Sequence, residues 1–437
     1  MTILPEPQAY SASLLPSLWA AEPRDVYAIS VEKHEGSRRV GGGGPGGAAG
    51  APPYPFQRDL LATEHHLRCG NAIVHRSSSL EDVTGFGQVH VVNLGSYYWS
   101  STLKDPRSWA IINTALENGI TDLAVWTAGN AGLSLAKMAY IANRRLPRER
   151  RLQIHAIVDI NVAPEIRTRL RMWQCEVLDI FRRDKPVLNP DEIKGLVTAR
   201  LKRSRRQLQD ASYWDVTDGW DGVGLLMYRF ISAQIVRDMA AAVEPAVSAH
   251  NPLSIVLPVG TGNLLLGFYL GVQDCERAGL IEPGSCKIVG AIPAGANIVA
   301  NIRQRKIPET IDEPQVHPHA ATQPIMPKLA SSHTPLAPCL AKLDQERLVH
   351  FVVVTEHDQM RAAKHVLPAG IDDGLACEPS ALATFAALPH VYTQLRSRQG
   401  EDRSWKYQSQ RRLLVVNSGL GILGHDEEEV LRRATGE

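Results

Sequence analysis

The sequence lacks features that mark several common protein classes. Its 47 Lys and Arg residues nearly balance 46 Asp and Glu residues, so the formal net charge of the 437-residue chain is +1 at pH 7. A chain without an overall positive field is not expected to bind nucleic acid. Aromatic residues make up only 6% of the chain, against 44% for all hydrophobic residues. This aliphatic-rich composition is typical of an α/β enzyme rather than of an all-β protein.

Cysteine pairs and export signals are also missing. None of the six cysteines lies in a C-x-x-C pair, which argues against a zinc ribbon and a thioredoxin-type redox motif. The chain begins Met1-Thr-Ile-Leu-Pro-Glu-Pro, without the basic and apolar regions of a secretory signal. Its most apolar stretch, from Ser254 to Val272, is broken by a proline and by glycines, which predicts strand, loop and helix rather than a membrane span. We therefore expect a cytoplasmic protein without a membrane partner.

The first 60 residues differ in composition from the rest of the chain. After Val40, the chain as far as Pro53 consists only of glycine, proline and alanine, and such a stretch cannot bury enough apolar surface to pack. Its glycines do not indicate a phosphate-binding loop, because no predicted strand precedes them and no predicted helix follows. We predict an N-terminal extension, residues 1–60, that contains a glycine-rich tether.

From about residue 89 onward, predicted strands and helices alternate. Hydrophobic patterns predict strands at 89–98, 121–126, 152–158, 254–258, 287–292, 349–354 and 413–417, and helices at 108–117, 133–143, 163–172, 223–243, 361–366, 380–388 and from 263 onward. This rhythm predicts an α/β fold with parallel-rich sheets, right-handed crossovers and flanking helices. A stretch at 307–338 is rich in Pro, His and Thr with little periodicity, and it receives no role.

A lysine stands where a predicted helix begins, in Ser100-Ser-Thr-Leu-Lys104-Asp105-Pro106. The positive end of the helix dipole disfavours a cation at this place. One explanation is that the Lys104 amine serves as a nucleophile or Schiff-base partner. The alternative is a solvated lysine followed by a capping Asp and a proline in the first turn.

Two further loops join a predicted strand to a predicted helix. The first is Thr127-Ala-Gly-Asn130-Ala-Gly132, and the second is Pro258-Val-Gly-Thr-Gly-Asn263. Small residues at a helix start let backbone amides converge on an anion such as a carboxylate or a phosphate. Each loop is equally consistent with an ordinary turn, the first one with an asparagine cap. The second is neither a Walker loop nor a dinucleotide fingerprint, because no Gly-Lys-Ser/Thr follows and Leu265 takes the place of the third glycine.

A third glycine-rich motif lies near the C-terminus. Asn417-Ser-Gly-Leu-Gly421-Ile-Leu-Gly424 matches G-x-G-x-x-G after a predicted strand, but only 437 − 424 = 13 residues follow it. An acidic ribose-binding residue about 20 positions further on has no room, and neither has the second strand of a nucleotide-binding unit. We therefore predict no dinucleotide site here.

Taken in order, these motifs resemble those of fold-type II pyridoxal-phosphate enzymes, and within them the threonine synthase-like group. That family carries a Ser-Phe-Lys-Asp-Arg motif, a Ser-Ser-Gly-Asn loop, a glycine-rich phosphate loop, a Glu-Pro-Ala-Ser-Ala segment and a Thr-Gly-His-Gly turn. The counterparts here are Ser101 to Pro106, Thr127 to Asn130, Gly260 to Asn263, Glu378 to Ala381 and Asn417 to Gly421.

The resemblance covers roughly residues 90–424 and implies a two-lobed fold like that of the tryptophan synthase β subunit, with the cofactor in the cleft between the lobes. The larger, cofactor-binding lobe would comprise residues 61–104 and 215–437, and the smaller lobe, residues 105–214, would carry the asparagine loop. The resemblance also implies a homodimer.

By this resemblance, Lys104 would hold pyridoxal 5'-phosphate as an internal aldimine and then move the α-proton of the substrate. Asn130 would bond the phenolic oxygen of the cofactor ring, and Ser418 would face the ring nitrogen. The cofactor-binding residues would be Lys104, Asn130, Gly260, Thr261, Gly262, Asn263 and Ser418, and the backbone amides of Thr127, Gly129, Asn130 and Ala131 would bind the substrate carboxylate. Glu378 would be a structural or ring-contact group, and no metal is expected, since His317 and His319 are most simply solvated.

A hydroxyl opposite the ring nitrogen, unlike a carboxylate, does not keep that nitrogen protonated, so the ring withdraws fewer electrons. This suits β-elimination and β-replacement at the side chain of an amino acid. The predicted activity is that of a lyase or synthase that eliminates or replaces a group at the β- or γ-carbon of a small amino acid. Three departures from the family pattern leave the substrate open: Pro106 in place of arginine, Thr127-Ala128 in place of two serines, and Ser418 in place of threonine. The alternatives are threonine synthase acting on O-phosphohomoserine, a cysteate synthase-like enzyme acting on a serine derivative, and a non-catalytic paralogue that binds the cofactor or another ligand.

Overall fold

The structure is a computed structural model that describes residues 73–96, 100–127, 129–159, 162–180, 190–203, 212–217, 222–243, 246–294, 334, 336–368, 376–399 and 412–419. The predicted N-terminal extension and nearly all of the 307–338 stretch lie outside these residues.

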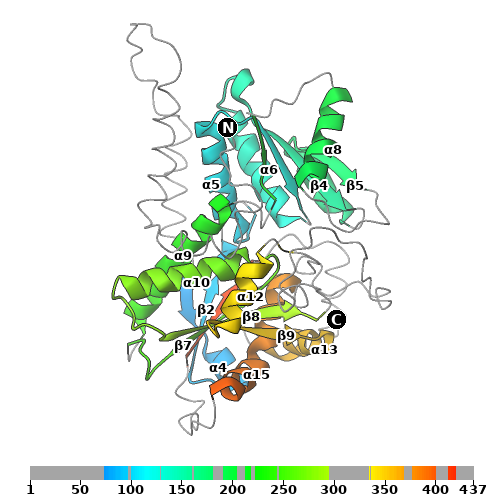
Figure 1. Cartoon of the computed structure of the whole chain (residues 1–437). Helices are drawn as coiled ribbons and strands as arrows, with labels where there is room; N and C mark the ends of the chain where they lie inside the picture. The colour runs from blue at the N-terminus through cyan, green and yellow to red at the C-terminus, as the bar shows by residue number, and fades with distance from the viewer. Residues whose placement is uncertain are drawn as a thin grey trace, which may run out of the picture.

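The described strands form two sheets (Figure 1). The six-stranded sheet has the order β1-β2-β10-β7-β8-β9, and its strands are Ile73–Arg76, Gln88–Asn93, Arg412–Asn417, Leu253–Pro258, Cys286–Pro293 and Val349–Val354. Only β1 is antiparallel to its neighbour. The four-stranded sheet is wholly parallel in the order β5-β4-β3-β6, with strands Glu176–Ile180, Gln153–Asp159, Asp122–Trp126 and Tyr213–Asp215.

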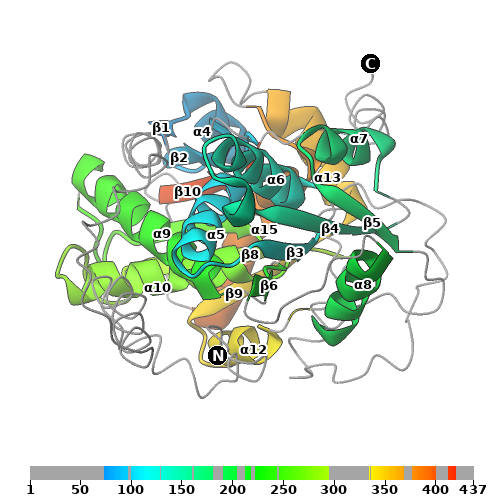
Figure 2. The ribbon, with the colours of Figure 1, turned by 90° about the horizontal axis from the view of Figure 1, so that it is seen from above.

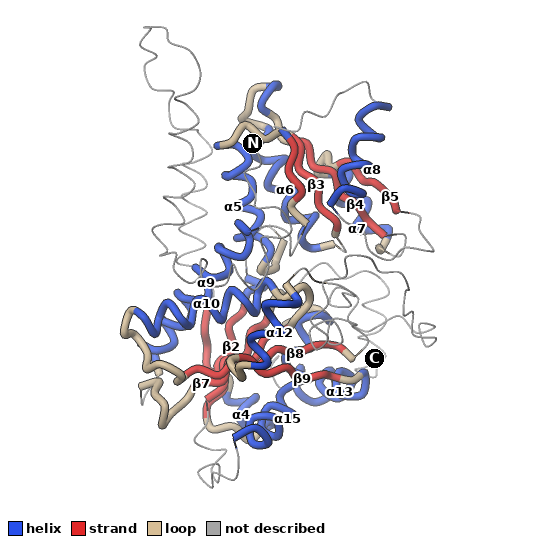
Figure 3. The backbone as a smooth tube through the Cα atoms, viewed as in Figure 1, coloured by secondary structure: helices blue, strands red, loops and turns tan. Residues whose placement is uncertain are grey.

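Helices cover both faces of the six-stranded sheet (Figure 3). One face packs on α9 (Gly222–Ala242), α10 (Asn263–Arg277) and α12 (Ala337–Gln345). The opposite face packs on α4 (Ser78–Thr84), α13 (Glu356–Arg361) with the π-helical turn at Ala362–Val366, and α15 (Pro379–Gln399). Strand β10 shows the consequence, since Leu414 and Val416 enter the first core while Leu413 and Val415 enter the second. A strand buried on both faces has a continuous apolar run, as the sequence of β10 does.

The four-stranded sheet lies above the six-stranded sheet in Figure 1 and over it in the view from above (Figure 2). Helices α5 (Lys104–Glu117), α6 (Asn130–Asn143) and α7 (Pro164–Met172) contribute to the core on one of its faces, and α8 (Pro190–Arg203) covers the other. The predicted α/β fold with parallel-rich sheets is confirmed. The exact lobe boundaries, after residues 104 and 214, stay a prediction.

Most predicted elements occur within one to four residues of their predicted bounds, but α15 is longer than expected. The sequence predicts a helix that ends at residue 388, just before Pro389, whereas α15 continues through Pro389 to Gln399. A proline inside a helix removes one backbone hydrogen bond. Pro389 itself is exposed, and the helix continues past it because residues on both sides of the proline, such as Phe385 and Val391, are buried in the core. Among the described residues, no helix has both the length and the apolar character needed to cross a bilayer.

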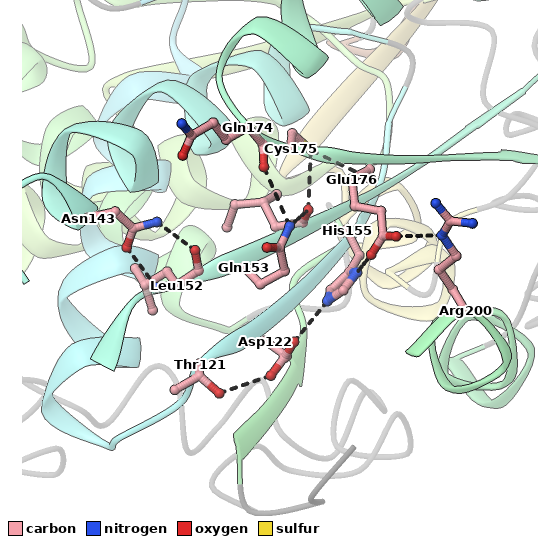
Figure 4. Close-up of polar contacts among 11 residues, drawn as sticks. Thr121, Asp122, Asn143, Leu152, Gln153, His155, Gln174, Cys175, Glu176 and Arg200 are labelled. Carbon is pink, nitrogen blue, oxygen red and sulfur yellow. Dashed lines mark hydrogen bonds and ion pairs between the residues drawn. The ribbon is translucent and has the colours of Figure 1, made fainter. Parts of the chain in front are cut away.

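A buried histidine joins three strands at the amino ends of the four-stranded sheet (Figure 4). The His155 Nε2 lies 3.0 Å from Asp122 Oδ1, and its Nδ1 lies 3.0 Å from Glu176 Oε2. Arg200 on α8 donates from Nε to Glu176 Oε1 at 2.5 Å. Only a protonated imidazole has two N–H donors, so only the charged form of His155 can donate to both carboxylates.

The pKa values agree with this arrangement. Burial alone lowers the pKa of His155, but its hydrogen bonds with Asp122 and Glu176 outweigh burial and hold that pKa above 6.5. The hydrogen bond with His155 lowers the pKa of Glu176 from 4.5 to about 2. The contribution of Glu176 to stability is therefore lost as the pH falls from 4.5 toward about 2, and that of His155 is lost as the pH rises above 6.5 through its raised pKa.

We expect Glu176→Gln to lower the free energy of unfolding by about 1–3 kcal/mol near pH 5.5, because buried His155 loses a charged acceptor. The loss should shrink at higher pH as His155 releases its proton. Urea denaturation of both proteins across a pH series measures the effect. Arg200→Gln is the control, since it removes an ion pair that is 49% exposed on the arginine side and should cost less than about 1 kcal/mol. A loss in Glu176→Gln that does not change with pH would contradict the charged network.

Candidate active site

The topology of the six-stranded sheet brings three of the predicted motifs to one edge. Strands β2, β10 and β7 are neighbours and run parallel, so their carboxyl ends lie side by side, where ligands of α/β proteins bind. The chain that leaves β2 leads to Lys104, the chain that leaves β10 leads to Ser418, and the chain that leaves β7 forms the loop at Gly260–Asn263.

Lys104 is the first residue of α5, as predicted. Its backbone N–H donates to Thr102 Oγ1 at 3.2 Å, and that hydroxyl lies 2.8 Å from the hydroxyl of Ser100. The fully buried Asp105 accepts from the Ser100 N–H at 2.8 Å and from the Ser134 hydroxyl on α6 at 2.7 Å. Asp105 is therefore an anchor between two helices rather than a simple cap, and it fixes the start of α5.

The segment that follows β10 pairs with the segment that precedes the lysine. Thr102 and Gly419 form an isolated antiparallel bridge, and the Leu103 N–H donates to the Ser418 carbonyl at 3.0 Å. A Cβ on Gly419 would lie 2.9 Å from Thr102 Cγ2, so only glycine allows this approach. On its other side, the Gly419 carbonyl accepts from the Glu378 N–H at 2.9 Å. The buried Ser418 is thus bonded directly to the lysine segment, and its neighbour Gly419 is bonded to Glu378.

Asn417, which received no role from the sequence, holds this segment in place. Its side-chain Nδ2 donates to the Ala376 carbonyl at 2.7 Å, and its Oδ1 accepts from the Gly419 N–H at 3.3 Å. Nδ2 also lies 3.3 Å from Oδ1 of Asn93, the last residue of β2. The available signal was its position, since Asn417 is a polar residue at the end of an otherwise apolar strand.

Asn130 and Glu378 meet at the junction of the two sheets. Asn130 opens α6 beside the four-stranded sheet, and its Nδ2 donates to the two carboxylate oxygens of Glu378 at 3.0 and 2.8 Å. Both residues are more than 90% buried, and Glu378 directly precedes α15, which packs on the six-stranded sheet. Glu378 is therefore a hydrogen-bonding partner of the asparagine expected to contact the cofactor.

Thr127 organises the loop that leads to Asn130. Its hydroxyl accepts from the N–H groups of Gly129 at 3.0 Å and of Gly132 at 3.1 Å. A Cβ on Gly132 would lie 2.5 Å from Thr127 Cγ2. Of the four amides predicted to bind the substrate carboxylate, that of Thr127 donates to the Ile157 carbonyl at 3.0 Å and that of Gly129 donates to the Thr127 hydroxyl. The amides of Asn130 and Ala131 are the two that remain for this role. The carboxylate role of this loop stays a prediction, and Ala128 lies outside the described residues.

The glycine-rich loop after β7 is braced by a segment that the sequence did not connect with it. The Thr334 hydroxyl donates to the Thr261 carbonyl, and the Leu336 N–H donates to Thr334 Oγ1 at 3.1 Å. Gly262 precedes α10 with φ of +95°, and a Cβ there would lie 2.6 Å from Leu340 Cδ1 on α12. Gly262, the residue that precedes the helix, has no side chain that could cap it. A helix N-terminus that its preceding residue does not cap is suited to a phosphate group.

The described cysteines do not compete for a catalytic role. All five are buried free thiols, and burial raises the pKa of Cys175 and Cys286 to about 12 and of Cys275 and Cys339 to about 11. Thiols with such pKa values are poor nucleophiles. Within the described residues, no group of three or more His, Cys, Asp or Glu side chains could hold a metal ion.

The residues at this edge fit pyridoxal phosphate. The start of α10 after Gly262 offers the backbone amides of a helix N-terminus to the phosphate. Lys104 supplies an amine, and the buried Asn130 amide and Ser418 hydroxyl supply polar partners for the ring. The backbone contacts of Ser418 with the lysine segment and of Gly419 with Glu378 link the lysine, serine and glutamate segments to one another.

We expect Gly262→Ala to raise the dissociation constant of the cofactor about tenfold, because a Cβ would strain a backbone at φ +95° and collide with Leu340. Gly279→Ala is the matched control, since Gly279 also has a positive φ but has no atom within 4 Å of its Cβ position. Absorbance titration of cofactor-free protein with pyridoxal phosphate measures both constants. The double variant with Leu340→Ala should recover part of the affinity, and equal affinities of Gly262→Ala and the native protein would contradict the assignment of this loop.

Solved structures of similar fold come from enzymes that act on small amino acids. A pyridoxal 5'-phosphate-dependent aspartate racemase is 15% identical, with 87% of this chain and 99% of that chain covered and a TM-score of 0.55. An O-ureido-L-serine synthase is 15% identical, with coverage of 79% and 88% and a TM-score of 0.53. Serine racemase from Dictyostelium discoideum is 15% identical, with coverage of 83% and 97% and a TM-score of 0.54. At these identities the likeness establishes the fold alone.

The sequence itself matches a family model. No curated protein matches the chain, but a model described as "Pyridoxal-phosphate dependent enzyme" matches residues 96–405, well over half of the chain. The matched range contains the lysine motif, the asparagine loop, the phosphate loop and Glu378. The chain therefore belongs to the family of pyridoxal-phosphate-dependent enzymes of fold type II.

Proposed function

We propose that the protein is a lyase or synthase that eliminates or replaces a leaving group at the β- or γ-carbon of a small amino acid. The observation that carries this proposal is the buried Ser418 hydroxyl at the carboxyl end of β10, next to the lysine segment. A neutral hydroxyl at the ring nitrogen leaves the ring a weaker electron acceptor than a carboxylate does. Loss of a leaving group needs less electron withdrawal than reactions that build up full charge at the α-carbon.

Bound pyridoxal phosphate supplies an aldehyde that condenses with amines and a ring that draws electrons from the bonds of the α-carbon. Lys104 is the residue that holds the cofactor and then carries the α-proton as general base. Its backbone is fixed by Thr102 and its neighbour Asp105 is buried, so the motion left to the residue lies in its side chain. The fixed backbone would limit the positions that Nζ can reach.

Asn130 serves both the ring and the protein. An amide nitrogen has two N–H groups, so one can bond Glu378 while the other bonds the phenolic oxygen of the ring. The bond to Glu378 fixes which end of the amide faces the carboxylate. We infer that the neighbouring amides at the start of α6 orient the substrate carboxylate toward the positive end of that helix.

Racemisation is the second candidate, because two of the similar structures are racemases. A racemase that works with two bases needs a proton-transferring group on each face of the α-carbon. The loop from Thr127 to Ala131, where the substrate carboxylate is expected, has no titratable side chain. This favours elimination or replacement, in which one base is sufficient.

The proposal includes two substrate assignments, and the alternative to it is a protein without catalysis. Threonine synthase would act on O-phosphohomoserine, and a cysteate synthase-like enzyme would act on a serine derivative. A paralogue without turnover would still bind the cofactor. We further propose a homodimer in the cytoplasm, with an amino acid as its small-molecule partner and no nucleic acid or membrane partner. Size-exclusion chromatography with light scattering tests the dimer.

We expect the cofactor-loaded protein to release 2-oxo acid and ammonia from O-phospho-L-serine or L-serine, and Lys104→Ala to reduce the rate by at least about 100-fold because the general base is lost. Coupled assays for 2-oxo acid, ammonia and phosphate measure turnover, and the near-visible absorbance of the cofactor should also disappear in Lys104→Ala. Lys137→Ala is the control, since Lys137 on α6 contacts the Trp173 ring instead.

The products separate the candidate functions. Phosphate released from O-phospho-L-homoserine together with threonine, and without 2-oxo acid, would identify threonine synthase. Appearance of the D-enantiomer of serine or aspartate on a chiral column, without 2-oxo acid, would replace the proposal by racemisation. Cofactor binding without turnover of any of these amino acids would favour the non-catalytic paralogue.

A further inference from the structure

A buried tyrosine from a distant part of the chain lies beside the amine of Lys104. The Tyr228 hydroxyl is 3.5 Å from Lys104 Nζ, and the centre of its ring is 5.8 Å from the same atom. Tyr228 is on α9, which packs against α5, and it is almost fully buried. A distance of 3.5 Å is at the long end of hydrogen bonding, and such bonds often tighten only when a catalytic site is loaded.

The backbone of Tyr228 is held by unusually close packing of α9 on α10. A Cβ on Gly267 would lie 2.5 Å from the Cβ of Tyr228, and a Cβ on Gly271 would lie 2.5 Å from Ser232 Oγ. The Ser232 hydroxyl lies 2.7 Å from the Gly267 carbonyl and 2.6 Å from the Tyr228 carbonyl. Two glycines one helical turn apart therefore let α9 approach the backbone of α10 closely, because α10 has no side chains at these two positions.

The next residue adds a second restraint. Arg229 donates through Nε and through an Nη to the two oxygens of Asp274 on α10, each at 2.7 Å. Both side chains are largely buried, so this paired contact is shielded from water and keeps its geometry. The phosphate loop begins the same helix α10 at Asn263. The helix pair α9 and α10 thus connects Tyr228 with the predicted phosphate loop, and Tyr228 in turn contacts Lys104 on α5.

A phenol suits a lysine that gains and loses a proton. Its oxygen can accept a hydrogen bond from an ammonium group, and its O–H can donate to the lone pair of a neutral amine. The electron-rich face of the ring also attracts the charged amine within about 6 Å. A hydroxyl does this without adding a charge of its own to a buried place.

We infer that Tyr228 is a positioning residue for Lys104, which orients Nζ through its hydroxyl, and that the close contact of α9 with α10 at Gly267 sets the place of that hydroxyl. This inference rests on the proposed role of Lys104 as the cofactor-binding lysine and general base. It extends that role by naming Tyr228 as the residue that orients the Lys104 amine when this amine is not bonded to the cofactor.

The test is the chemical reactivity of Lys104 in the full-length, cofactor-free protein. A trace amount of acetic anhydride labels the neutral fraction of each amine, and peptide mass spectrometry reports the label on Lys104. We expect Tyr228→Phe, which keeps the ring, to raise the labelling rate near pH 8 about threefold, because the ammonium form loses an acceptor. Tyr269→Phe is the matched control, since Tyr269 is a buried tyrosine of α10 whose pKa is raised to about 12 by burial and by Glu346. An unchanged Lys104 labelling rate in Tyr228→Phe would overturn the inference.

A second readout uses the cofactor-loaded protein. The pH midpoint of its near-visible absorbance should move by at least about 0.5 pH unit in Tyr228→Phe and stay in place in Tyr269→Phe. Labelling needs neither cofactor nor substrate, so it gives its answer even if none of the proposed amino acids is turned over. Conversely, normal turnover with unchanged labelling would reject the role of Tyr228 and leave the proposed function intact.

The contribution of helix packing is tested by Gly267→Ala. We expect this variant to change Lys104 labelling in the native background and to have no additional effect in Tyr228→Phe. An equal effect in both backgrounds would show that Gly267 acts by a route other than the tyrosine hydroxyl, and would overturn that part of the inference. Should Gly267→Ala fail to fold, Tyr228→Phe still decides the role of the hydroxyl.

Discussion

The parallel direction of β2, β10 and β7 is the constraint on which the candidate site depends, since it brings three chain segments out of the sheet at the same edge. The register is fixed because β10 is buried on both faces, so a slip of one residue would exchange its two sets of core side chains. In the observed register, Asn417 lies opposite Asn93. Asn417 then directs Ser418 and Gly419 toward the lysine segment through its own hydrogen bonds.

A buried polar contact joins the two sheets, since Asn130 bonds Glu378 across their junction. Beside it, within the four-stranded layer, Asp105 ties α5 to α6, and the fully buried Arg107 donates to the Val216 carbonyl. Buried polar groups depend on their partners, because an unpaired one costs about 1–3 kcal/mol. The junction therefore has a specific geometry, and a site at such a junction can hold polar cofactor atoms at defined places.

Local patterns predicted most of the fold and left out what depends on distant contacts. Apolar periodicity located seven of the ten described strands but missed β1, β5 and β6. The glycine-rich loop after β7 was predicted to bind the cofactor phosphate, and that role stays a prediction. The bracing of Thr261 by Thr334 and of Gly262 by Leu340 could not be predicted, because α12 follows a long stretch without periodicity. The charged pair of carboxylates around His155 was also missed, since its members lie on three separate strands.

By itself, the sequence determined the α/β class and the lysine that opens a helix, because these follow from periodicity and from a short motif, and the cofactor followed from the resemblance of five motifs, taken in order, to a known family. Only the tertiary structure decided that Glu378 bonds Asn130, that Asn417 holds the Ser418 segment, and that Tyr228 lies beside Lys104. Residues 124 or 248 positions apart become neighbours only when sheets and helices have packed. Their contacts depend on the packing of α9 on α10 and on the junction of the sheets, which no single stretch of sequence encodes.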